Sequence, residues 1–167
     1  MNYIYFALYQ GTSTISRIIR GRGKHSHVEG ICKNGSCVGA WHIGGVTHKD
    51  AGCLNFHDNM VASLSINHTP GTKVDIFKIE CTREQADLFE ELMLQEVGVG
   101  YDFWSIFFFV LRKPVAVNGK WFCSELFFDV LTQLDIWILV EIKASEVSPN
   151  HLGISPAKEF VEQIVTI

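Results

Sequence analysis

Alternating apolar and polar residues predict β-strands in the first half of the chain. The patterns cover Tyr3–Leu8, Val28–Lys33, Ser36–His42 and Gly71–Cys81, and a period of two is typical of strands that bury one face. The second and third patterns flank Asn34-Gly35, a dipeptide that favours the tight turn of a hairpin. These segments therefore predict four strands, two of which form a hairpin.

Apolar residues three and four positions apart predict helices in the second half. Thr82 stands where it can cap a helix over Arg83–Glu96, and Gln85 is the matching partner of a capping box. A last helix is expected over Ala157–Val165. Between them, another helix is expected to begin at Cys123, because the apolar residues after it share one helical face. They are Leu126, Phe127, Val130, Leu131 and Leu134.

The stretch "YDFWSIFFFVL", Tyr101–Leu111, is apolar nearly all round a helix. It is much shorter than the roughly 20 residues that span a bilayer, and Arg112–Pro114 stops it. We therefore expect no transmembrane segment here. Two interpretations stay open: a helix that is buried on two sides, or a surface for a hydrophobic partner or a lipid. The second would use Trp104, Phe107 and Phe108.

The composition fits one globular domain with a hydrophobic core. The chain has 167 residues, of which 47% are hydrophobic and 19% charged. We therefore expect a single domain over residues 1–167. The N-terminal "MNYIYFALYQGTS" has no basic leader, long apolar region or cleavage site of a signal peptide, so a cytoplasmic protein is expected.

Charge argues against nucleic acid as a partner, because the formal net charge is -4. One segment is locally basic, however: "SRIIRGRGKHSH", Ser16–His27. It is either a solvated loop or a contact for an acidic ligand or a phosphate.

The cysteines do not form a metal-binding or disulfide pattern. There are five of them, Cys32, Cys37, Cys53, Cys81 and Cys123, and none is part of a CxxC pair. We therefore expect free thiols in a reducing compartment and no metal site.

Cys123 stands out because it lies at the expected start of a helix, in "GKWFCSELFFDVL". Unpaired backbone N–H groups and the positive end of the helix dipole favour an anion at this position. They would lower the pKa of the thiol and make it a nucleophile, and they could also stabilise a substrate oxyanion. The alternative is a buried and inert cysteine.

A base for this thiol is available on the first hairpin strand. His27 heads that strand, and Glu29, two residues on, points to the same side. A Cys–His pair needs the imidazole near the sulfur and a third polar group that holds the ring. A strand histidine can equally be a solvated residue with no catalytic role.

Four segments occur in an order that resembles a known family: "SHVEGI" with "GSCVGAWHIGGV" after it, "GVGYDFWSI", "KWFCSELFFDVL" and "SPNHL". Together they are similar to the circularly permuted branch of the NlpC-type, papain-like cysteine hydrolases. This is the YiiX-like group, and in particular its small bacteriophage-encoded members. The match runs from about Ser26 to Leu152. In that branch the strands that carry the histidine precede the helix that carries the cysteine, as in this chain.

The resemblance implies an α+β, circularly permuted papain-like fold, in which a small antiparallel sheet or half-barrel packs against helices. It makes Cys123 the nucleophile and His27 the general base. Tyr101 would lie near the thiol and contact substrate, and Trp121 is a second substrate-binding candidate. The family's third residue lies on the next strand, where this chain has Gly39 and Ala40 before His42. The orienting group is therefore His42, which we favour slightly, or Glu29, or a backbone carbonyl.

The implied chemistry is acyl transfer through Cys123, with no metal and no organic cofactor. We expect a thiol peptidase or amidase that acts on a peptide or isopeptide bond. Two alternatives remain: a lipid-directed acyltransferase or thioesterase, and a phage-encoded binding module that acts on a host protein. A phage protein would work in the host cytoplasm or in the virion. The substrate itself is not identified by the sequence.

Overall fold

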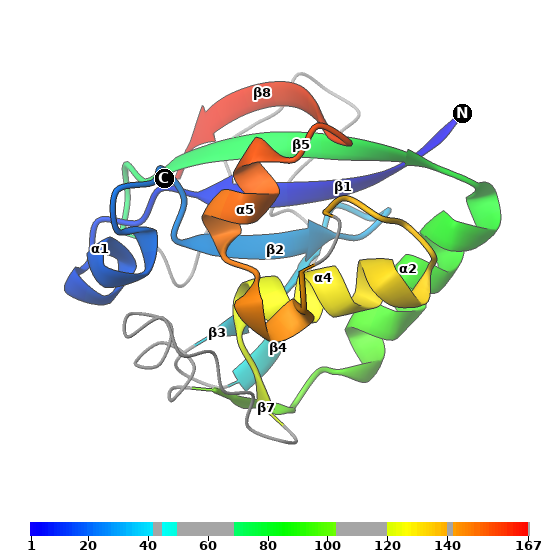
Figure 1. Cartoon of the computed structure of the whole chain (residues 1–167), viewed down its shortest axis with the longest axis horizontal. Coiled ribbons are helices and arrows are strands. Elements are labelled where there is room, and N and C mark those ends of the chain that lie inside the picture. The colour runs from blue at the N-terminus through cyan, green and yellow to red at the C-terminus, as the bar shows by residue number, and fades with distance from the viewer. Residues whose placement is uncertain (42–44, 50–68, 103–119, 140–141, 167) are drawn as a thin grey trace.

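A six-stranded antiparallel sheet forms the centre of the computed structural model, with the strand order β4-β3-β2-β1-β5-β8 (Figure 1). The structure describes residues 1–41, 45–49, 69–102, 120–139 and 142–166. The six strands are β1 (Asn2–Tyr9), β2 (His27–Ile31), β3 (Cys37–Trp41), β4 (Gly45–Lys49), β5 (Lys73–Cys81) and β8 (Glu159–Val165). The predicted α+β class with an antiparallel sheet is confirmed.

The central strand β1 pairs with β2 on one side and with β5 on the other. Phe6, Leu8 and Val28 belong to a large hydrophobic cluster that includes residues of the helices. Tyr9 and Ile31 belong to a second, smaller cluster. Neighbouring residues of a strand point to opposite faces, so the sheet has one face toward the helices and one face away from them.

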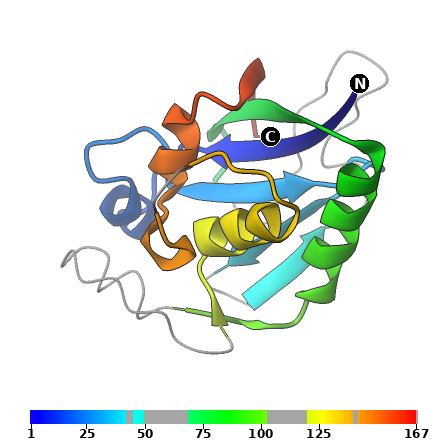
Figure 2. The same ribbon diagram turned by 45° about the vertical axis from the view of Figure 1, so that its right-hand side comes forward.

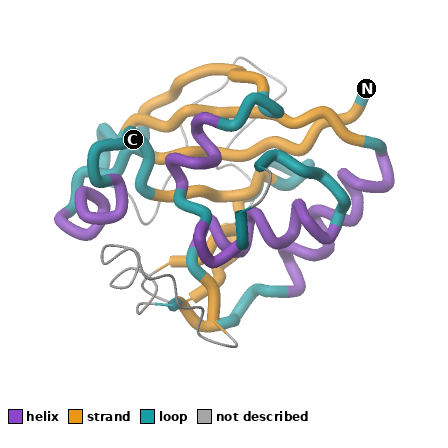
Figure 3. The backbone as a smooth tube through the Cα atoms, viewed as in Figure 1, coloured by secondary structure: helices purple, strands orange, loops and turns teal. Residues whose placement is uncertain are grey.

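Two helices cover that first face of the sheet, α2 (Arg83–Gln95) and α4 (Cys123–Gln133). They lie side by side in front of the strands (Figure 2). The capping box predicted at Thr82 and Gln85 is confirmed, since each donates a backbone N–H to the other's side chain. Three shorter helices complete the described part: α1 (Thr14–Arg20), the 3-10 turn Ala144–Glu146 and α5 (Pro149–Ile154) (Figure 3).

The helix predicted over Ala157–Val165 is wrong, because this segment contains strand β8, which pairs antiparallel with β5. Phe160 and Ile164 are four residues apart, a spacing that fits one face of a helix and also one face of a strand. The free edge of β5 decides between the two, since it supplies backbone partners that the sequence pattern does not reveal. The short helix α5, which lies just before, was not predicted.

A second, two-stranded sheet brings Tyr101 beside Trp121. Its parallel strands are β6 (Gly100–Tyr101) and β7 (Lys120–Trp121), so Tyr101 begins no helix. The rest of the predicted apolar helix, with Trp104, Phe107 and Phe108, lies outside the described residues. Among the helices that the structure describes, none is both long and apolar enough to cross a membrane.

Candidate active site

Cys123 is the first residue of α4, as the sequence predicts. Its neighbours fix this end of the helix. Glu125 accepts a hydrogen bond from the backbone N–H of Phe122 at 3.4 Å, and the hydroxyl of Ser124 donates to the carbonyl of Val147 at 2.6 Å. The Cys123 side chain is buried, with 1% of its surface exposed.

The sulfur of Cys123 lies where the two hairpin strands part. The ladder between β2 and β3 includes the pair Gly30 and Val38, and two residues further on it would join Val28 to Ala40. The pairing between these two described strands stops short of that position. The backbone N–H of Val28 instead faces the sulfur. The start of α4 thus meets the sheet at the opening between β2 and β3.

Burial overturns the expected low pKa of the thiol. Removal from water raises the pKa of Cys123 to about 12, although the backbone N–H groups of Val28, Ser124 and Cys123 itself favour the thiolate. The nearby carboxylate of Glu29 raises it further. The sequence correctly indicated the N–H donors at the helix start, but it could not show how deeply the sulfur is buried. At neutral pH the resting thiol is therefore protonated.

His27 is the first residue of β2, and its imidazole packs at a tilt against two aromatic rings. The ring centroid lies 3.9 Å from that of Trp41 and 5.6 Å from that of Tyr9. The register pairs His27 with Tyr9. The imidazole lines the same pocket as Tyr101, which belongs to the large hydrophobic cluster that also contains Cys123. Since His27 directly precedes Val28, its backbone adjoins the amide that faces the sulfur.

The carboxylate of Glu29 lies beside His27. Its Oε1 is 3.8 Å from Nε2 of His27, and only 1% of the residue is exposed. The hydroxyl of Tyr9 donates to Oε2 at 2.5 Å, and Nε1 of Trp41 donates to Oε1 at 2.8 Å. Gly39 permits this arrangement, because a Cβ there would lie 2.8 Å from Cγ of Glu29.

The predicted third residue, His42, lies outside the described residues. Of the two side chains that the sequence offered for this role, the structure describes Glu29, whose Oε1 lies within ion-pair distance but beyond hydrogen-bond distance of Nε2 of His27. Tyr9 and Trp41, which hold the carboxylate, were not predicted. The two-residue turn predicted at Asn34-Gly35 gave no signal for Trp41, because it places residue 42 opposite residue 27, whereas the observed register places residue 41 there.

A pocket of about 340 Å³ opens beside the imidazole. His27, Trp41 and Tyr101 line it together with Ser26 and the first turn of α1. Its lining is therefore a mixture of aromatic rings and hydroxyl groups, which suits a polar ligand with some apolar surface.

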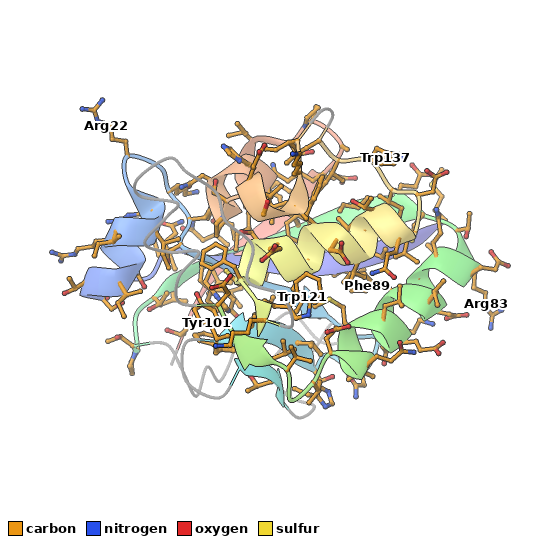
Figure 4. The ribbon with its side chains drawn as sticks, turned by 60° about the horizontal axis from the view of Figure 1, so that its bottom comes forward. Arg22, Arg83, Phe89, Tyr101, Trp121 and Trp137 are labelled. Atoms are coloured by element: carbon orange, nitrogen blue, oxygen red, sulfur yellow. The ribbon has the colours of Figure 1, made fainter. Side chains whose placement is uncertain are left out.

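Tyr101 is the predicted substrate-binding residue that reaches this pocket. It is 8% exposed, and burial raises the pKa of its hydroxyl well above the usual value, with further contributions from Cys123 and Asp102. Trp121 is its neighbour across β6 and β7 (Figure 4). The indole of Trp121 donates to Glu96 at 2.5 Å, which ties it to the end of α2.

The described residues contain no cluster of three or more histidine, cysteine, aspartate or glutamate side chains arranged to hold a metal ion. Cys32, Cys37, Cys81 and Cys123 are free thiols.

A scan against protein-family models and a search of curated proteins both find no match for this chain.

Proposed function

We propose that the chain is a cysteine peptidase or amidase, a thiol hydrolase that cleaves an amide bond through an acyl-enzyme on Cys123. The single observation that carries this proposal is the position of the sulfur. It lies at the start of α4, faced by three backbone N–H groups, one of which belongs to the peptide bond that follows His27. A permuted, papain-like arrangement of the NlpC type, in a phage-encoded member, is part of the same proposal.

In the first half of the reaction, His27 takes the thiol proton as the sulfur attacks the substrate carbonyl carbon. Backbone N–H groups at the start of α4 stabilise the negative oxygen that forms. The C–N bond then breaks, and the imidazolium gives its proton to the leaving amine. A base is required at this step, because burial keeps the resting thiol protonated.

In the second half, water attacks the thioester and gives its proton to His27. The C–S bond breaks, the acid product leaves, and Cys123 regains its proton. Glu29, 3.8 Å from Nε2, stabilises the imidazolium of His27 by its charge in both halves, while Tyr9 and Trp41 hold Glu29. Substrate binds in the pocket beside Tyr101.

The test uses iodoacetamide labelling at pH 7, followed by mass spectrometry of each cysteine. If His27 acts as the base, the His27→Ala variant labels Cys123 at least about tenfold more slowly, since general bases contribute roughly 10²–10⁴-fold. Cys81, which is only partly buried, is the internal control and keeps its rate in both proteins. An equal Cys123 rate in the variant and the parent contradicts the proposal.

A second candidate function is a binding module without catalysis. The observation in its favour is the burial of the sulfur, which is 1% exposed and has a pKa of about 12. This function predicts that the parent protein labels Cys81 but leaves Cys123 unmodified under the same conditions. The lipid-directed alternative depends on Trp104, Phe107 and Phe108, outside the described residues, and stays a prediction.

A further inference from the structure

The segment Val147–Asn150 contacts both halves of the candidate site. It includes the first residues of the "SPNHL" motif, to which the proposed reaction assigns no role. One end of the segment is bonded to the residue after Cys123, and the other end is bonded to the residues just before His27. These two contacts connect parts of the chain that are more than 20 and more than 120 residues apart in sequence.

On the histidine side, the contact is made by the amide of Asn150. Its Oδ1 accepts from the backbone N–H groups of Lys24 at 2.8 Å and of His25 at 2.7 Å, and its Nδ2 donates to the carbonyl of Arg20 at 3.0 Å. The loop closes tightly around this amide. A Cβ at Gly23 would lie 2.2 Å from it, so only glycine fits there.

On the cysteine side, the hydroxyl of Ser124 makes the contact with this segment. This residue is fully buried and donates to the carbonyl of Val147 at 2.6 Å. Val147 is itself 1% exposed. Ser124 is the second residue of α4, so its bond fixes the helix start at the turn that holds the thiol.

The segment is itself held in place by α5. A shift at its contact with the loop before His27 therefore also moves its contact with the start of α4. Ser148 caps α5 by accepting from the backbone N–H of His151 at 3.2 Å, and Pro149 occupies the first turn. Leu152 is fully buried in the large hydrophobic cluster, together with Cys123. α5 therefore cannot shift without disturbing the core beneath the sulfur.

We infer that Val147–Asn150 is a brace that sets the separation of the Cys123 sulfur and the His27 imidazole. Asn150 is then a positioning residue that acts through His27, and Ser124 is one that acts through Cys123. The inference rests on the proposed Cys–His chemistry. Displacement of a reacting group by about 1 Å can lower a rate by as much as 10²-fold, so a brace of this kind affects reactivity as well as stability.

The experiment measures Cys123 labelling by iodoacetamide at pH 7 in Asn150→Ala, with and without His27→Ala. Asn150→Ala alone is expected to slow the labelling of Cys123 about tenfold and to leave Cys81 unchanged. In the His27→Ala background the same substitution is expected to have no further effect, because the base that it positions is absent. A purely structural role would change the Cys123 rate equally in both backgrounds, which would overturn the inference.

Two further variants keep the test informative if Asn150→Ala does not fold. Asn150→Asp keeps the Oδ1 that accepts from Lys24 and His25 but loses the Nδ2 donor to the Arg20 carbonyl. Its Cys123 rate is therefore expected to fall by less than tenfold, and a loss of tenfold or more contradicts the inference. Ser124→Ala removes the other contact and is expected to slow Cys123 labelling while sparing Cys81, and an unchanged rate contradicts the inference.

The proposed function and the brace can fail separately. If the labelling of Cys123 does not depend on His27, the proposed function is wrong. If it depends on His27 but not on Asn150 or Ser124, only the brace is wrong.

Discussion

Glu29 is a buried carboxylate that is held by two donors, and this makes it sensitive to a change of one atom. Tyr9 and Trp41 both donate to it, at 2.5 Å and 2.8 Å. In Glu29→Gln an NH₂ group replaces one acceptor and faces a donor, which leaves a buried group unsatisfied. We expect the free energy of unfolding to fall by about 1–3 kcal/mol, as measured by urea denaturation.

A matched control for this substitution is Glu91→Gln on α2. Glu91 is exposed and accepts one hydrogen bond from Gln95 at 3.1 Å. Its replacement is expected to change the stability by less than about 0.5 kcal/mol. Equal effects of the two substitutions would show that the Glu29 carboxylate is not specifically held.

At the level of single residues, the sequence predicted the position of Cys123 but not its environment. The helix start was readable because Leu126, Val130 and Leu131 follow at helical spacing. The raised pKa of the Cys123 thiol could not be predicted, since it depends on burial by segments far away in the chain. Trp41 was not predictable either, because a two-residue turn at Asn34-Gly35 gives a hairpin register that is one residue away from the observed one.

Among the elements, α2 has the clearest signal in the local sequence, which is the capping box at its start. Thr82 and Gln85 exchange hydrogen bonds of 2.9 Å and 3.1 Å, and these satisfy two backbone donors at the helix start. Thr82→Ala is expected to lower the free energy of unfolding by about 1 kcal/mol, as measured by urea denaturation. Gln95→Ala, at the exposed end of the same helix, is the control and is expected to cost less than about 0.5 kcal/mol.

The elements that depend on distant partners were the ones that the sequence missed. β8 has only one buried residue, Ile164, so its own pattern carries little information about its structure. Its strand conformation depends on the ladder with β5. The register between β2 and β3 also differs from the predicted one, since a two-residue turn at Asn34-Gly35 would pair Gly30 with Gly39, whereas Gly30 pairs with Val38.

For the whole molecule, short-range sequence patterns were enough to predict the fold class, whereas the arrangement of the elements in space depends on contacts between distant segments. The hairpin, α2 and α4 follow from short-range patterns, and together they are enough for an α+β prediction. The strand order and the contact between Asn150 and the Lys24–His25 backbone join segments from opposite ends of the chain. No short-range pattern encodes such a contact, so the connection between the two halves of the candidate site required the structure.

A cluster of polar side chains around the buried Asp75 also joins distant parts of the molecule. Asp75, on β5, is 1% exposed and binds Lys24 and His25 at 2.7 Å each. Gln163, on β8, donates to its other oxygen at 2.6 Å. The cluster thus links the loop before β2 to the far edge of the sheet.

The cluster makes stability depend on pH in a predictable direction. Burial favours the neutral acid, but the hydrogen bonds from Lys24, Gln163 and His25 outweigh it and lower the pKa of Asp75 from 3.8 to about 2. A lowered carboxyl pKa stabilises the folded state above the unfolded pKa, and that stabilisation is lost as the pH falls through the folded pKa. At about 1.4 kcal/mol per unit, the contribution is about 2 kcal/mol at neutral pH.

Asp75→Asn tests this dependence directly, because it removes the titrating group. At pH 7 the variant is expected to be about 2 kcal/mol less stable than the parent by urea denaturation, and the difference should close between pH 4 and pH 2. Glu80→Gln, an exposed position on the same strand, is the control and should follow the parent at every pH. A difference that persists unchanged down to pH 2 would mean that Asp75 stabilises the fold by packing, because a packing contribution does not titrate.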